Sequence, residues 1–323
     1  SNYGVSDNVW YPILNLKSMK HSYSILIPSN SIKYLRWCIP SIIKATINYN
    51  CEILILHDSG ANVDHWTYCE AISTKYSNVR VFKNNTSIRL GISGGYKYLS
   101  QQATKDVICH WHNDMFMMPN TLDVVDNWLD NDPNSVICLT RIEPTIYGSD
   151  LAKIQWKDGP VMVEDWDEIK FNEFVATLPT RLSTNGHFAP FFMNRSNYNN
   201  IGGNDIEHFP YQSREDSDFA FRIALAGYQT YQIPIYVYHF ASRGNRRAID
   251  PYHDNPEWVR HNNNATRNFI RKWKTLNMHD QYLMPFKPKV YNRHINIIFD
   301  NSIIKDLDYI YIILYIIEPY ADT

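Results

Sequence analysis

Short apolar runs rich in Ile, Leu and Val recur along the first part of the chain, and each is followed by polar residues. Runs of this length and composition are typical of buried strands. They cover residues 23–28, 51–56, 79–82 and 106–111. We therefore predict four strands, with the polar residues that follow each one at an edge of the sheet.

Stretches with apolar positions at helical spacing separate these runs. They cover residues 32–47, 63–76 and 92–102. Pro40 lies inside the first stretch, and because proline lacks a backbone N–H we expect a kink or a break there. Regular alternation of strand and helix predicts an α/β fold with a mostly parallel sheet flanked by helices.

The pattern is less regular after residue 140. Residues 140–185 contain several Trp, Asp and Pro residues and read either as an insertion or as one side of a binding site. An apolar run at 188–193 predicts a further strand, and helices are predicted at 215–226 and at about 257–276.

The apolar run at 309–317 is too short to span a bilayer, which takes about 20 residues. We expect a buried segment or an oligomer interface there, and no membrane span. The rest of residues 277–323 shows no pattern to which we assign a role.

Composition narrows the class of protein. The 323 residues are 44% hydrophobic and 20% charged, as in ordinary globular proteins, and the net charge of −2 argues against nucleic acid as the main ligand. Five cysteines without a C-x-x-C pair predict buried, reduced thiols and hence a cytoplasmic location. The high Asn, Ile and Tyr content suggests an AT-rich genome, viral or bacterial. For a viral source, the compartment would be the cytoplasm of the infected host.

Ligands of parallel sheets bind beyond the carboxyl ends of the strands. Polar clusters stand at three such ends in this chain. They are Ser29 and Asn30, then His57 and Asp58, and finally His112, Asn113 and Asp114.

Asp114 is a candidate ligand for a hard cation such as Mn²⁺ or Mg²⁺. A turn-capping role is the plainer alternative. A second alternative is the His-x-His-x-Asp-His zinc motif of metallo-β-lactamase-like hydrolases, since His110, His112 and Asp114 follow that spacing; Met115 stands where the motif has its last histidine.

Acidic residues open the helix predicted at 215–226. Glu215, Asp216 and Asp218 would be stabilised by the helix dipole, so they could serve only as caps, but an ionised carboxylate is also what a general base requires. Further along, His239 follows a strand-like run and could be structural or a ligand.

A loop with basic residues follows His239. Arg243 and Arg246 lie among Gly and Ser residues, and such a loop could close over a diphosphate or simply face solvent.

Taken together, these motifs resemble glycosyltransferase family 2. A Gly-rich stretch precedes a helix, an Asn-Asp pair follows a strand, a Gly-Gly turn leads to a Glu-Asp pair, and a histidine comes later. The corresponding residues are Gly91–Gly95, Asn113-Asp114, Gly202-Gly203, Glu215-Asp216 and His239. The resemblance covers about residues 23–274.

This resemblance implies a GT-A fold with a Rossmann-like nucleotide-binding half, an acceptor half and a C-terminal extension. The implied boundaries are an N-terminal extension at 1–22, a GT-A domain at 23–250 and a C-terminal helix and tail at 251–323. Within the domain, 23–114 would bind the nucleotide and 115–250 the acceptor.

It also implies roles for the site residues. Asp114 and His239 would bind Mn²⁺ or Mg²⁺, Asp216 would be the catalytic base of an inverting single displacement, and Glu215 would orient the acceptor or the loop. The nucleotide-sugar donor, which we expect to be UDP-linked, would contact Ser29, Asp58, Arg89, Gly91, Asn113 and Asp114, with Arg243 and Arg246 at its diphosphate. Apart from the resemblance, Trp156 is expected at the acceptor because aromatic rings stack on sugar faces, with ordinary core packing as the alternative. Asp218 is expected at the acceptor too.

The family pattern is not followed throughout, since His57, Lys97 and His112 replace residues that are common in it. A nucleotidyltransferase would need a glycine after the first strand, and residues 29–33 have none. A non-catalytic GT-A-like binding protein and the zinc hydrolase stay open at this point. The acceptor class, a hydroxyl on a glycan, a protein or a lipid-linked molecule, is open too.

Overall fold

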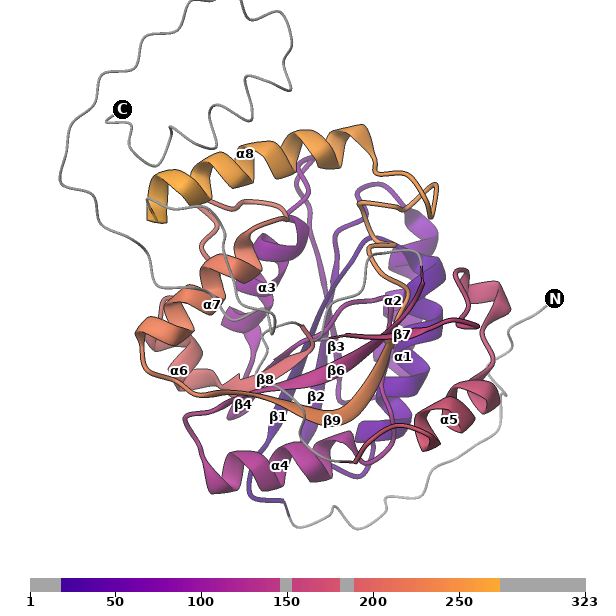
Figure 1. Cartoon of the computed structure of the whole chain (residues 1–323). Coiled ribbons are helices and arrows are strands. Elements are labelled where there is room, and N and C mark those ends of the chain that lie inside the picture. Colours follow the sequence, from indigo (N-terminus) through magenta and orange to yellow (C-terminus); the bar gives the residue numbers. More distant parts are fainter. Residues whose placement is uncertain (1–18, 146–152, 181–188, 274–323) are drawn as a thin grey trace, which may run out of the picture.

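The computed structural model describes residues 19–145, 153–180 and 189–273, which form a single sheet with helices on both faces (Figure 1). The nine strands are β1 Tyr23–Ser29, β2 Cys51–His57, β3 Val79–Lys83, β4 Val107–His110, β5 Met115–Phe116, β6 Val136–Pro144, β7 Lys153–Trp156, β8 Phe191–Asn194 and β9 Thr230–His239. The helices are α1 Ile32–Thr46, α2 Val63–Lys75, α3 Gly91–Gln102, α4 Thr121–Asn131, α5 Glu168–Ala176, α6 Arg195–Asn200, α7 Glu215–Leu225 and α8 Pro256–Trp273, with a short 3-10 helix at Val163–Asp165.

The strands follow the order β3-β2-β1-β4-β8-β6-β9-β5, and β7 also pairs with β6. β1 to β4 pair in parallel, β8 runs antiparallel to both β4 and β6, and β9 runs parallel to β6. The carboxyl ends of β1, β2, β4, β6 and β9 therefore meet at one edge of the sheet.

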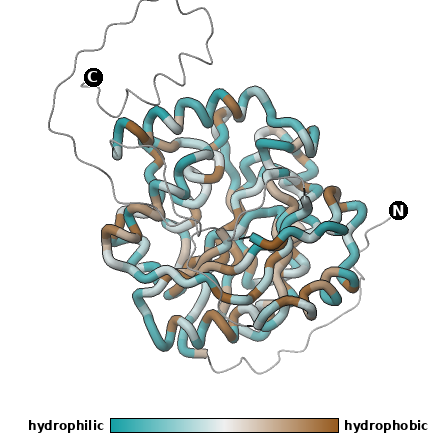
Figure 2. The backbone as a smooth tube through the Cα atoms, viewed as in Figure 1, coloured by the Kyte–Doolittle hydropathy of each residue, from teal (hydrophilic) through white to brown (hydrophobic). Residues whose placement is uncertain are grey.

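Strand β1 shows how the two faces are covered. Ile25 and Ile27 point into a core with α1, α2 and α4, whereas Leu26 points into a second core with α3, α6 and α7. This alternation follows from the two-residue period of a strand. Apolar segments gather around the sheet, while the long helix α8 is mostly hydrophilic (Figure 2).

The four strands and three helices predicted in the first part of the chain are confirmed, with ends that shift by up to a few residues. Of the kink or break expected at Pro40, the break does not occur, because α1 continues through this residue. Buried side chains on either side, including Leu35, Ile39 and Ile42, pack against the sheet and hold the helix together despite the lost hydrogen bond.

The region 140–185 is more regular than the sequence pattern indicates. β6 begins before it, at Val136, and all nine of its residues are buried. Arg141 and Glu143 interrupt the apolar run, which explains why the pattern did not reveal a strand that pairs with β7, β8 and β9.

Helix α8 lies across α7 at the C-terminal end of the described chain (Figure 1). Phe269 packs against Phe221 of α7 and Phe209, and Lys272 forms ion pairs with Asp205 and Asp218 at 2.6 Å each.

Among the described helices, none combines the length and apolar character that a bilayer crossing requires. The apolar run at 309–317, the tail from 277 and most of the predicted extension at 1–22 lie outside the described residues.

Candidate active site

A cavity of about 550 Å³ opens at the sheet edge where the carboxyl ends of the strands meet. It brings together residues from distant parts of the chain, as the predicted parallel sheet requires. Ten residues assigned from sequence line it: Ser29, Asp58, Arg89, Gly91, Asn113, Asp114, Glu215, Asp216, His239 and Arg246.

Three side chains in this cavity are grouped as metal ligands are. Ligand atoms of His112, Asp114 and His239 all lie within 4.8 Å of one another. The pairing of β5 with β9 causes this grouping, because Met115 lies opposite His239 and Asp114 immediately precedes Met115. His239 Nε2 lies 3.3 Å from Asp114 Oδ1.

Glu143 fixes the orientation of the His239 ring. Its Oε1 lies 2.7 Å from His239 Nδ1, and both side chains are buried. Because a carboxylate only accepts hydrogen bonds, Nδ1 carries the proton and Nε2 faces Asp114. A carboxylate behind a histidine in this way is the usual support for a metal-binding imidazole.

The chemistry of this group fits a divalent cation. His239 Nε2 is buried and makes no well-formed hydrogen bond within the described residues. Burial lowers the pKa of His112 to about 3, so its ring is neutral and offers a lone pair. Burial would raise the pKa of Asp114, but His239 outweighs it and holds that pKa at about 2, so the carboxylate is charged. Two imidazoles and a carboxylate can hold Mn²⁺.

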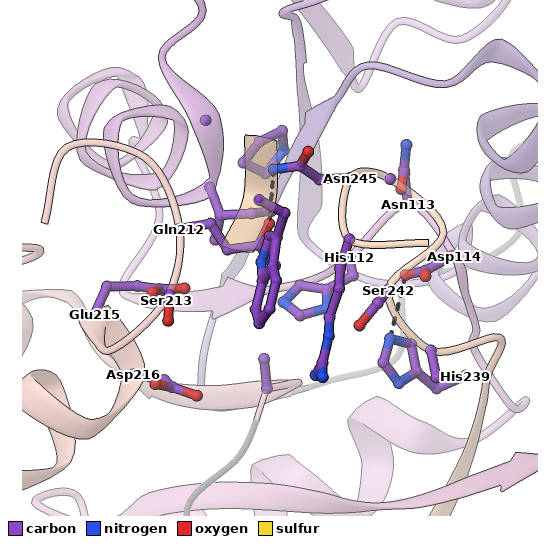
Figure 3. A pocket seen from close by; sticks show the side chains of 18 of the residues that line it. His112, Asn113, Asp114, Gln212, Ser213, Glu215, Asp216, His239, Ser242 and Asn245 are labelled. Atoms are coloured by element: carbon purple, nitrogen blue, oxygen red, sulfur yellow. Dashed lines mark hydrogen bonds and ion pairs between the residues drawn. The ribbon is translucent and has the colours of Figure 1, made fainter. Parts of the chain in front are cut away.

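Two further carboxyl groups, Glu215 and Asp216, lie across the cavity from His112, Asp114 and His239 (Figure 3). They occupy the first turn of α7, after Ser213 and Arg214 adopt positive φ angles of 83° and 64°. Asp216 is exposed, whereas Glu215 Oε2 is buried without a hydrogen-bond partner among the described residues. Burial and the nearby Asp216 raise the pKa of Glu215 to about 8.

The edge assigned to the nucleotide is built around Asp58. Its carboxylate accepts hydrogen bonds from Asn84 Nδ2 at 2.8 Å and from the backbone N–H groups of Leu90 and Gly91 at 3.0 and 2.8 Å. Arg89 Nε donates to the carbonyl of Asp58 at 3.2 Å. Asp58 therefore holds the segment that leads into α3, in addition to lining the cavity.

Arg243 and Arg246, both assigned to the diphosphate, differ in their surroundings. Arg243 does not line the cavity: it is buried, its guanidinium donates to the Val161 carbonyl at 2.7 Å, and its backbone N–H donates to Asp114 Oδ2 at 3.1 Å. Arg246 lines the cavity and forms a bidentate pair with Asp254 at 2.9 Å.

The two residues assigned to the acceptor do not line the cavity. Trp156 is 8% exposed, and its ring stacks on Phe174 with 5.1 Å between centroids. Asp218 is fully buried and pairs with Arg222 and Lys272.

Sequence reasoning considered His112 as a ligand only in the zinc-hydrolase alternative, and it missed Glu143 altogether. The spacing of His112 and Asp114 after a strand was a usable signal for the first. No local signal marked Glu143, because its partner His239 is 96 positions away. His110, by contrast, stacks on Tyr96 with 3.9 Å between ring centroids, away from the metal group.

The sequence profile of glycosyl transferase family 2 matches residues 24–202, and the chain belongs to this family. No curated protein sequence matches the chain. The chain is similar in structure to GalNAc-T7, solved with UDP, GalNAc and Mn²⁺, at 18% identity and a TM-score of 0.53, over 69% of this chain and 44% of that one.

Two further solved structures are similar. A mannosyltransferase from Pyrobaculum calidifontis in complex with GDP-Man and Mn²⁺ is 11% identical, with a TM-score of 0.51 over 78% of this chain and 63% of that one. TarS of S. aureus, residues 1–349 with UDP, is 14% identical, with a TM-score of 0.51 over 80% of this chain and 67% of that one.

These comparisons confirm the GT-A fold and the glycosyltransferase family expected from the motifs. The chain spans less than two thirds of the length of the first two structures. The zinc-hydrolase alternative loses its basis, because His110 lies outside the metal group and the family is a different one.

Proposed function

We propose that this protein transfers a glycosyl group from a nucleoside-diphosphate sugar, with a UDP-linked sugar as the expected donor, to an acceptor hydroxyl with inversion at the anomeric carbon. One observation carries the proposal: a metal-ligand group and a carboxyl pair lie on opposite sides of one cavity at the carboxyl edge of the sheet. Separation of this kind suits a reaction in which the leaving group departs on one side and the nucleophile is activated on the other.

His112, Asp114 and His239 would hold the cation, Mn²⁺ or Mg²⁺. When bound, it supplies positive charge that stabilises a departing diphosphate. Two similar structures, GalNAc-T7 and the mannosyltransferase, were solved with both Mn²⁺ and a nucleotide or nucleotide sugar, which supports this assignment. Arg246, on the loop after β9, would meet the diphosphate, while Arg243 would act through its backbone N–H on Asp114.

Ser29, Asp58, Arg89, Gly91 and Asn113 would form the nucleoside side of the cavity. At the other side, Asp216 would remove the proton of the acceptor hydroxyl as that oxygen attacks the anomeric carbon. The protonated neighbour Glu215 would donate a hydrogen bond and orient the acceptor.

The acceptor would be a hydroxyl of a glycan, a protein or a lipid-linked molecule that enters beside Asp216. Trp156 and Asp218 would support the acceptor side of the cavity from the core without contacting the acceptor. The five cysteines are all free and buried, which supports a reducing compartment such as the cytoplasm.

Cation-dependent nucleotide binding tests the proposal. UDP or GDP at about 100 times its dissociation constant, with MnCl₂, should stabilise the fold by about 2.7 kcal/mol and raise the melting temperature by roughly 4 °C. Asp114→Ala should abolish this increase. Glu143→Gln should weaken Mn²⁺ binding by about 10- to 100-fold, because a neutral amide behind His239 makes its imidazole a weaker ligand than a carboxylate does.

Asp158→Asn, an exposed acid outside the cavity, is the matched control and should behave as wild type. An increase in melting temperature that persists in EDTA would argue against a cation-bridged diphosphate. Binding without sugar transfer to any acceptor would instead indicate a non-catalytic relative.

A further inference from the structure

A chain of buried hydrogen bonds lies directly behind the nucleoside side of the cavity. His57, at the end of β2, and His65, in the first turn of α2, are both fully buried, and their Nδ1 atoms are 2.6 Å apart. His65 Nε2 lies 2.8 Å from Ser29 Oγ, which in turn accepts from Asn113 Nδ2 at 3.1 Å. The far end of the chain is His57 Nε2, 3.1 Å from the Gly60 carbonyl.

The Gly60 carbonyl sets the direction of every bond in this chain. A carbonyl only accepts, so His57 Nε2 must carry a proton, and in a neutral ring its Nδ1 must then accept. His65 Nδ1 donates to it, so His65 Nε2 accepts from the Ser29 hydroxyl. Burial lowers the pKa of both rings, that of His65 to about 4 with a contribution from His57, which keeps them neutral.

The same donor and acceptor rules fix the orientation of Asn113, the last member of the chain. With its proton given to His65, the Ser29 oxygen can only accept, so Asn113 must turn its Nδ2 toward Ser29. The Asn113 Oδ1 then faces the other way, toward the loop at Gly244. A Cβ added to Gly244 would lie 3.7 Å from this oxygen. Both Ser29 and Asn113 line the cavity, whereas His57 and His65 do not.

We propose that His57 and His65 are positioning residues that act through Ser29 to hold the Asn113 carboxamide with its oxygen free for a hydrogen-bond donor of the nucleotide, such as a ribose hydroxyl or a base N–H. Two fully buried imidazoles are costly unless hydrogen-bonded, so apolar residues would serve a purely structural role better. The Asn62 side chain, which accepts from the His65 backbone N–H at 3.1 Å, fixes the start of α2 and thereby the place of His65.

Substitution of His65 tests the proposal, which rests on the proposed function for its binding readout. His65→Leu removes the link to Ser29, and the dissociation constant of UDP or GDP measured with MnCl₂ should rise about 3- to 10-fold, the worth of one hydrogen bond. His65→Gln can still donate toward His57 and accept from Ser29, so it should stay within about 2-fold of wild type.

Ile72→Ala is the matched control, because Ile72 is buried on the same helix and belongs to no part of the hydrogen-bonded chain. It should lower the melting temperature without changing the nucleotide dissociation constant. If His65→Leu and Ile72→Ala weaken nucleotide binding equally, or if His65→Gln binds as poorly as His65→Leu, the positioning role is wrong.

Imidazole nitrogen NMR of the nucleotide-free protein tests the chain independently of the enzyme's function. It should find His57 protonated at Nε2 and His65 at Nδ1, and Ser29→Ala should change the Nε2 shift of His65. The reverse tautomers would overturn the proposal. Failure of the wild type to bind either nucleotide would contradict the proposed function but leave the tautomers as the test of the chain.

Discussion

At the scale of single residues, Glu215 and Asp216 are adjacent but face different surroundings. Glu215 has a buried carboxyl oxygen, and burial together with Asp216 raises its pKa to about 8. Asp216 is exposed, and its Oδ1 accepts from the backbone N–H of Ser217 at 2.7 Å. A carboxyl that is protonated at neutral pH cannot act as a base, so this contrast favours Asp216 for proton removal.

We expect Asp216→Asn to reduce sugar transfer by about 10²–10⁴-fold, the usual contribution of a positioned general base. Donor and metal binding should change little, because the substitution keeps the shape and removes only the basicity. Steady-state kinetics with the donor varied would show a lower kcat at nearly constant KM.

Glu215→Gln is the matched comparison and should cost much less, because glutamine resembles the protonated acid. Near-full turnover of Asp216→Asn would rule out the base assignment. A product that keeps the anomeric configuration of the donor, as read by proton NMR, would rule out a single displacement.

At the scale of elements, α3 shows how closely the helices approach the sheet. Gly95 lies against Pro28 of β1, where a Cβ would come within 2.6 Å of the proline ring. A Cβ at Gly94, one position earlier, would lie 3.1 Å from Leu90 Cβ, a contact that a shift of a few tenths of an ångström would relieve. The close contact between α3 and β1 therefore requires a glycine at position 95 but not at position 94.

Gly95→Ala should lower the free energy of unfolding by about 1–3 kcal/mol, because the added methyl group forces α3 away from β1. Gly94→Ala should be near neutral, since about 1 kcal/mol of improved helix propensity offsets a small shift of Leu90. Urea unfolding midpoints at unchanged slope would measure the difference. Equal costs at the two positions would contradict close packing as the reason for Gly95.

At the scale of the whole molecule, buried and half-buried carboxyls set how stability depends on pH. Burial would raise the pKa of Asp205, but hydrogen bonds from Lys272 of α8 and from the His208 backbone lower it to about 2. Glu215 is shifted the opposite way, to about 8. The two groups therefore act on stability at opposite ends of the pH range.

We expect the free energy of unfolding to fall as pH drops from about 4 to 2, since unfolded Asp205, with a pKa of about 3.9, takes up its proton first. It should also fall as pH rises from about 4.3 to 8, because folded Glu215 retains a proton that the unfolded chain has released. Asp205→Asn should reduce the loss of stability between about pH 4 and 2, and Glu215→Gln should reduce the loss between about pH 4.3 and 8, as measured by urea unfolding across pH. If either loss persists in the corresponding variant, other groups cause that pH dependence.

The sequence by itself determined the alternation of strands and helices and several of the residues that line the cavity. Periods of two and 3.6 residues are local properties, so buried strands such as β1 and β2 and the amphipathic helix α1 are visible without any partner. Asp114, Asp216 and His239 stand out locally because each follows a strand or opens a helix, but the roles expected of them came from the resemblance to the family.

Only the tertiary structure decided which of these side chains meet and which are already engaged. Glu143 reaches His239 across 96 positions, and Arg243 reaches Asp114 across 129, because β6 and β9 are neighbours in the sheet and the β9 end lies beside β5. Strand order and helix placement also decide that β6 is buried despite its charged residues. They decide as well that the Gly60 carbonyl sets the direction of the hydrogen-bond chain. Local periodicity carries no information on such long-range pairings, so no spacing rule could have given them.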